Sequence, residues 1–252
     1  TFCSFASLLA MQVLAQTPNL KWGKPSKEEL AMTVCEIDRE AKAVVLYSRT
    51  SVRYDFQQGD FKIVKNVRKR IKVLGEEGKN WANGNITTIS LSNGRKETVT
   101  RLEATAYNMD GDKVVKTKMP SDLRDVAKVD EQRYMTKFTV PQVTIGTVIE
   151  YEYETLSDVN TYIEDWVAQD VIPVLYTTYE TVIPDVFIYR LDETGMSVLH
   201  HNRETVPMHY TITRDNHLDV NATVETFTGR NLPSLRDYQF LYSIWTYAQR
   251  VS

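Results

Sequence analysis

The chain has 252 residues, enough for one large all-β domain or two smaller ones. Hydrophobic residues make up 42% of the sequence, which is typical of globular proteins and argues against wholesale disorder. The net charge of −3 is too small to favour nucleic acid or an anionic membrane as a partner. The sequence contains neither zinc-type Cys/His spacing nor a phosphate-binding glycine loop, so we expect no cofactor and no metal.

The first residues differ in composition from the rest. An uncharged apolar run from Phe5 to Ala15 is too short to span a bilayer, and Val13 and Ala15 lie where a signal peptidase requires small side chains. We expect residues 1–15 to be part of a signal peptide, with a buried N-terminal helix as the alternative. Its removal would leave Cys35 as the only thiol, which fits an exported bacterial protein of the periplasm or cell surface, with no membrane span in the mature chain.

The remaining chain carries one helix signal followed by many strand signals. Ser26 and Glu29 form a capping box, which predicts a short helix ending near Ile37, and a helical turn is expected over 75–81. Abundant Tyr, Thr and Val favour strands. Alternating or continuous apolar runs place these at 43–54, 61–73, 98–107, 113–116, 134–140, 149–153, 162–169, 174–183, 186–191, 207–214 and 218–227. About ten or more mostly antiparallel strands with one short helix predict an all-β sandwich over residues 16–233.

Two hairpins are expected among these strands. The turn-rich residues 108–112 connect the strands at 98–107 and 113–116. The second hairpin would pair 134–140 with 149–153 around a turn bracketed by Pro141 and Gly146, because apolar side chains alternate along both runs.

Charged side chains form two stripes. Glu150, Glu152 and Glu154 share one face of a strand, and a basic stripe lies on another strand, formed by Arg68, Arg70 and Lys72. The acidic stripe invites comparison with the carboxylate pair of glycosidases, but three acids in a row indicate a solvated face. The basic stripe lacks the interleaved aromatic residues of nucleic-acid sites. We expect both stripes on one sheet face, paired across strands.

Other reactive residues give little support for chemistry. Cys35 should lie at the end of the short helix, buried and inert, so no catalysis is expected on this chain. His209 and His217 can approach each other across a turn, but His200 and His201 point to opposite faces of a strand, and no acids or cysteines surround them in a metal-binding pattern. The sequence 110–112, Asp-Gly-Asp, is expected to be a turn and not a calcium site.

Aromatic residues supply the candidate ligand or interface positions. Residues 234–252 form an aromatic-rich tail that includes Phe240, Tyr242 and Trp245, and such a tail either closes its own sandwich or contacts a partner surface. Sugars bind flat aromatic faces, so Trp81, Trp166 and Trp245 are candidate stacking platforms. Core or interface tryptophans are the alternative.

Several segments of the chain together resemble one known family. The most specific segment is Pro-x-Val-x-x-Gly-Thr-Val-Ile-Glu-Tyr at 141–151. The other segments are Lys24–Leu30, Ala106–Gly111, Tyr134–Val140, Trp166–Asp170, Pro173–Val174 and Tyr179–Pro184. Together they resemble the domain of unknown function that precedes transglutaminase-like domains in exported Gram-negative proteins, and the resemblance covers residues 24–233.

The resemblance implies an immunoglobulin-like sandwich followed by a downstream papain-fold domain that carries a Cys-His-Asp triad. The family offers no established ligand, and no catalytic residue transfers to this chain. We therefore expect an accessory domain that packs on the downstream domain and presents a peptide or protein substrate. The alternative is an extracytoplasmic glycan-binding module.

Overall fold

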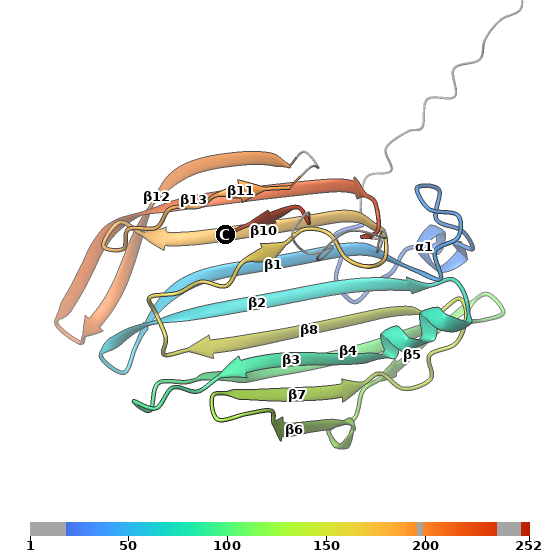
Figure 1. Ribbon diagram of the computed structural model, residues 1–252, viewed down its shortest axis with the longest axis horizontal. Helices are drawn as coiled ribbons and strands as arrows, with labels where there is room; N and C mark the ends of the chain where they lie inside the picture. The colour runs from blue at the N-terminus through green and yellow to red at the C-terminus, as the bar shows by residue number, and fades with distance from the viewer. Residues whose placement is uncertain (1–18, 196–198, 236–247) are drawn as a thin grey trace, which may run out of the picture.

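The computed structural model describes residues 19–195, 199–235 and 248–252, and it is built mostly of β-strands. Eight strands form one large sheet (Figure 1). In spatial order they are β12 (His200–Thr213), β13 (Asn216–Leu232), β10 (Val174–Pro184), β1 (Ala43–Gln57), β2 (Asp60–Val73), β8 (Val148–Ser157), β4 (Glu97–Asp110) and β5 (Lys113–Lys118). The pair β1–β10 is parallel, and the other neighbouring pairs of this sheet are antiparallel.

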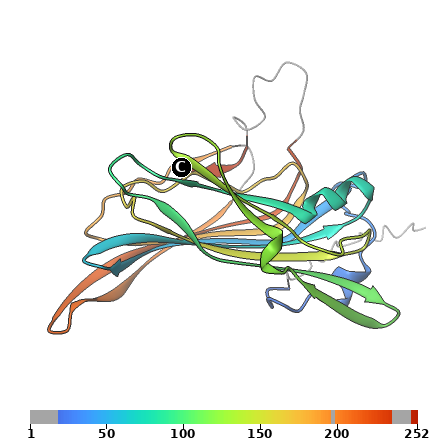
Figure 2. The ribbon, with the colours of Figure 1, turned by 90° about the horizontal axis from the view of Figure 1, so that it is seen from below.

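Two three-stranded sheets lie on one side of the large sheet, and the N-terminal helix lies on the opposite side (Figure 2). The first contains β3 (Asn83–Ile89), β7 (Arg133–Thr139) and β6 (Arg124–Lys128). The second contains β11 (Glu193–Thr194), β14 (Arg250–Val251) and β9 (Trp166–Val167). The described part of the chain also contains the 3₁₀ helices η1 (Glu76–Ala82) and η2 (Ser121–Leu123). It contains no helix long and apolar enough to cross a membrane.

We call the side that carries the small sheets the inner face of the large sheet. The main hydrophobic core lies there and joins Ile71 and Ile149 of the large sheet to Phe138 of β7 and Trp166 of β9. A second, smaller core on the outer face joins Leu30 of the helix to Val44, Leu46, Tyr107 and Val148. Both faces of the central strands are therefore partly covered, which explains why β1 is apolar along most of its first half.

The sequence expectations for local structure are confirmed at several points. The capping box is present, because the Ser26 Oγ accepts from the Glu29 amide and the Glu29 carboxylate accepts from the Ser26 amide. The 98–107 and 113–116 runs form the expected hairpin, although β4 extends to Asp110 and the turn is limited to Gly111 and Asp112. The helical turn expected over 75–81 is found as η1, with Gly75 as its N-cap. Gln58 and Gly59 both have positive φ, as the two-residue turn between β1 and β2 requires.

The expected hairpin between 134–140 and 149–153 is wrong. β7 pairs with β3 and β6, whereas β8 pairs with β2 and β4, so the two runs belong to different sheets. Their apolar faces meet across the core, where the Phe138 and Tyr151 rings make an edge contact at 5.4 Å between centroids. Alternation reports that one face of a strand is buried but does not identify the strand beside it.

Two other elements differ from expectation. α1 (Lys27–Ala31) ends well before Ile37, because the Leu30 carbonyl accepts a hydrogen bond from the Lys72 ammonium of β2 and the chain becomes extended at Met32. The strand expected at 186–191 is absent, since Phe187 instead stacks on the Tyr54 ring at 4.2 Å. Tertiary contacts override local propensity at both positions.

Candidate functional site

The candidate site is a cleft on the inner face of the large sheet, beneath the connection that runs from β8 to β10. This connection spans residues 158–173, crosses β2 and β1, and contains β9 (Figure 1). A cavity of about 200 Å³ lies under it. Its walls come from β1, β2, β8, β10 and the connection: Ser48, Thr50, Val52, Lys65, Val67, Lys69, Tyr153, Glu164, Asp165, Trp166, Val167 and Tyr179.

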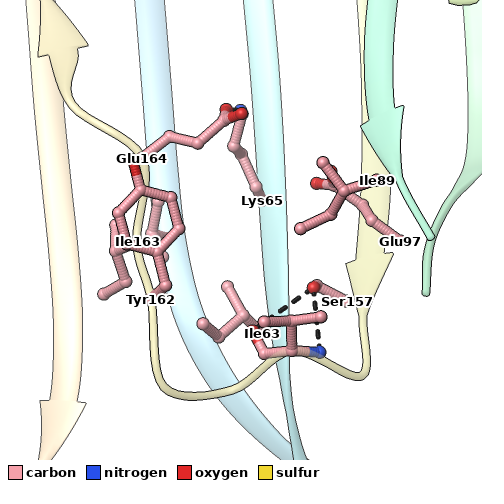
Figure 3. Close-up of a pocket in the computed structure, with 10 residues that line it drawn as sticks. Ile63, Lys65, Ile89, Glu97, Ser157, Tyr162, Ile163 and Glu164 are labelled. Atoms are coloured by element: carbon pink, nitrogen blue, oxygen red, sulfur yellow. Dashed lines mark hydrogen bonds and ion pairs between the residues drawn. The ribbon is translucent and has the colours of Figure 1, made fainter. Parts of the chain in front are cut away.

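A smaller pocket of about 30 Å³ adjoins this cavity, sharing Val52, Lys65 and Glu164 with it. Figure 3 shows the Lys65 and Glu164 side chains meeting above β2 at the edge of the smaller pocket. Burial raises the pKa of Glu97 in this pocket, although its carboxylate accepts a hydrogen bond from Thr155 at 2.7 Å. The two hollows thus lie side by side along the central strands.

Two lysines rise from the floor of the cleft. Lys65 and Lys69 lie two residues away from Ile63, Val67 and Ile71 along β2. Side chains two residues apart point to the same side of a strand, so both lysines share the inner face with these core residues. A lysine is rarely placed among core residues unless it has a partner. Both lysines have one, and both partners come from the connection.

Lys65 Nζ lies 2.6 Å from a Glu164 carboxylate oxygen, and Lys69 Nζ lies 2.9 Å from a carboxylate oxygen of Asp170. Burial by itself lowers the pKa of Lys69, but the Tyr151 hydroxyl and the Asp170 carboxylate outweigh it, so the pKa lies above its usual value. Burial, Tyr153 and Glu164 act on the pKa of Lys65 in the same way. Both ammonium groups are therefore charged at neutral pH.

Hydroxyl groups line the floor beside the lysines. Ser48 lies directly opposite Lys69 in the β1–β2 ladder, and Thr50 lies opposite Val67. Each is only 8% exposed, and neither hydroxyl has a hydrogen-bond partner among the described residues. Both residues line the cavity, so water or a ligand there can be the hydrogen-bond partner of their hydroxyls.

Aromatic rings close the side of the cleft next to β10. The Trp166 ring stacks on the Tyr179 ring at 5.0 Å with an interplanar angle of 9°, and Trp166 is 7% exposed. Burial raises the pKa of Tyr179 to about 12, so its hydroxyl remains a neutral donor at neutral pH. The cleft therefore combines ammonium groups, hydroxyls, carboxylates and aromatic rings, which suits a small polar ligand and not an apolar one.

The structure brings some of the predicted aromatic positions together. Trp166 lines the cavity, and Trp81 of η1 lies beside it, with its ring centroid 5.9 Å from Lys69 Nζ. Trp245, Tyr242 and Phe240 lie outside the described residues. Lys65 and Lys69 were not predicted as site residues, although their spacing of two from Ile63, Val67 and Ile71 indicated that they share the face of the core residues.

The two charged stripes lie opposite each other on the outer face of the same sheet, as predicted. Arg68 is directly opposite Glu152 and Arg70 is directly opposite Glu150, with ion pairs of 2.9 Å and 2.5 Å. The expectation of a solvated acidic face is wrong, because Glu150 and Glu152 are buried. Arg70 also contacts the N-terminal segment, which covers this end of the face.

The remaining predicted residues lie apart from the cleft. The His209 and His217 rings stack at 4.8 Å, which confirms their expected approach, and His209 pairs with Asp219. Within the described ranges, no group of three or more His, Cys, Asp or Glu side chains is arranged to hold a metal. Cys35 is buried, as expected, although it follows the helix at a distance, and burial raises the pKa of its thiol.

Comparison with known proteins identifies the fold more clearly than the function. No family model matches this chain, and no curated protein matches it. Among solved structures, a crystal structure of a "putative protease" from Parabacteroides distasonis matches with a TM-score of 0.61 and 12% sequence identity. The match covers 83% of this chain and 40% of that chain, so this chain spans less than half the length of that protein. At this identity the likeness concerns the fold alone.

Proposed function

We propose that this chain is a non-catalytic accessory domain of a larger exported protein, and that it holds or presents a peptide or protein substrate. Its catalytic partner would be a downstream transglutaminase-like domain of the same polypeptide. The sandwich would be immunoglobulin-like, and the mature protein would face the periplasm or the cell exterior. The resemblance of residues 24–233 to the domain that precedes transglutaminase-like domains is the source of these details.

One observation carries the proposal, namely the polar cleft at the place where a sandwich normally has only core. Two lysines and the Ser48 and Thr50 hydroxyls face a cavity there, and charged and polar groups of this kind are uncommon among core residues. The match to part of a longer "putative protease" chain supports an arrangement in which this fold is one module among others. The buried Cys35, with its raised pKa, is a poor nucleophile, which favours binding over catalysis.

The glycan-binding alternative has less support. A sugar platform needs an open aromatic face, but one face of Trp166 is taken by Tyr179 and the residue is nearly buried. Trp81 is half-buried and packs against the main core.

The experiment that tests the accessory role uses the full-length protein and a variant from which residues 16–233 are deleted. Turnover of labelled casein is measured for both, with the deleted domain also added back in trans. We expect the deletion to lower kcat/KM at least about tenfold, mainly through KM, because substrate holding is lost while the chemistry is retained. Equal kcat/KM for the two proteins would contradict the proposal.

A further inference from the structure

We propose that the cleft binds a short peptide by its free carboxyl terminus, with Lys69, Ser48 and Thr50 receiving the carboxylate. The inference rests on the proposed function in one respect, since it names the chemistry of the ligand that the accessory domain would hold. The binding itself is a property of the cleft and is argued from the cleft alone.

Hydrogen-bond donors are concentrated at one end of the cavity floor. Lys69 and Ser48 are direct cross-strand neighbours, and Thr50 is two residues further along β1 on the same face. The Lys69 ammonium has three N–H donors, and the Asp170 carboxylate and the Tyr151 hydroxyl are partners for two of them. The remaining donor and the two hydroxyls form a set that matches the two oxygens of a carboxylate, the kind of acceptor that binds charged donors most strongly.

Acidic groups are concentrated at the other end. Glu164 pairs with Lys65, and the neighbouring Asp165 is exposed at the rim without a hydrogen bond or ion pair to any described residue. An ammonium group at this end would gain a carboxylate partner. The charges along the cleft therefore run from donor-rich to acceptor-rich, which matches a zwitterion better than a simple anion.

The dimensions favour about three residues. Lys65 and Lys69 are four residues apart on one strand, so their Cα atoms are about 13 Å apart. An extended tripeptide spans about 10 Å, which allows its carboxylate to reach Lys69 while its amino group approaches Asp165. The cavity of about 200 Å³ is smaller than typical drug-sized pockets and excludes bulky ligands.

Apolar surface lies between the two polar ends. Val67 forms the floor between Lys65 and Lys69, Val52 lies beside Lys65, and Trp166 is at the side. Small aliphatic side chains, such as those of alanine, would bury against this surface without having to displace the Trp166–Tyr179 stack.

The test is a titration of this protein with Ala-Ala-Ala, followed by NMR chemical-shift changes or calorimetry. We expect saturable binding, at least about tenfold weaker for the C-terminal amide Ala-Ala-Ala-NH₂, which lacks the carboxylate. Lys69→Gln and Thr50→Val should each weaken binding, the latter without any change of charge. Lys62→Gln is the matched control, since it removes an ion pair from β2 to Asp158 of the same connection but lies outside the cavity lining.

Several outcomes would overturn the inference. These are an absence of binding at about 10 mM peptide, equal affinity for the free acid and the amide, or a loss with Lys62→Gln as large as with Lys69→Gln. If Lys69→Gln fails to fold, the near-isosteric Thr50→Val variant decides the question. A negative titration leaves the accessory role standing, because that role is measured by casein turnover. A positive titration with unchanged turnover upon deletion would leave a peptide-binding domain without the accessory role.

Discussion

Arg70 of β2 offers the sharpest test of how the outer face is stabilised. Its side chain is fully buried and donates to Glu150 at 2.7 Å, to Glu29 at 2.9 Å and to the Asn19 and Lys21 carbonyls at 2.7 and 2.6 Å. Arg70→Met keeps most of the apolar stem but leaves a buried carboxylate without its cation. Breaking a buried ion pair from one side costs about 3–5 kcal/mol.

The assay is urea unfolding of both proteins, with thermal unfolding as a second measure. A loss of this size lowers Tm by about 6–20 °C for a domain of this length. Arg68→Met is the matched control, because the Arg68 side chain is 34% exposed and its partner Glu152 also pairs with Arg101. We expect the control to cost less than about 1 kcal/mol. Equal losses for the two variants would refute the reasoning.

Three further predictions concern other buried groups. Burial lowers the pKa of Lys72 to about 8, so the folded protein binds the Lys72 proton less tightly than the unfolded chain does. The free energy of unfolding should therefore rise between about pH 8 and the usual lysine pKa of about 10.4. Urea unfolding across this range should show that rise in the parent and a smaller one in Lys72→Met. A Cβ at Gly84 would lie 2.1 Å from the Phe138 ring, so Gly84→Ala should cost about 1–3 kcal/mol by overpacking, and an unchanged urea midpoint would contradict this. In a Cys3→Ser background, Cys35 should resist iodoacetamide until the protein unfolds, and rapid alkylation of the native state would show an accessible thiol.

The sequence alone predicts much of the local structure. Period-two alternation located most of the long strands, and it placed Arg68 and Arg70 on the same face as their glutamate partners. These features depend on side-chain direction along one strand, which follows from whether a residue is at an odd or an even position. The β-rich class followed from the same patterns.

Pairing and burial depend on contacts between distant segments, so they were predicted less well. Tyr134–Val140 was assigned to the wrong neighbour because its apolar face packs across the core and not along a ladder. Glu150 was expected in solvent, but the N-terminal segment covers it through the amide of Gly23. No pattern within β8 could reveal that cover.

The cleft was missed for a related reason. Lys65 and Lys69 were not singled out, although their positions along β2 place them on the inner face. Their partners, Glu164 and Asp170, come from a connection about a hundred residues later in the chain. Only the folded chain brings the four charges together over one cavity.

The most direct test of the central claim, that the cleft is where this domain holds its ligand, is a crystal structure of the protein soaked with Ala-Ala-Ala. We predict density for the peptide beneath the 158–173 connection, with its carboxylate on Lys69 Nζ and the Ser48 and Thr50 hydroxyls. Ordered water alone in the cavity, or peptide bound elsewhere on the surface, would contradict it.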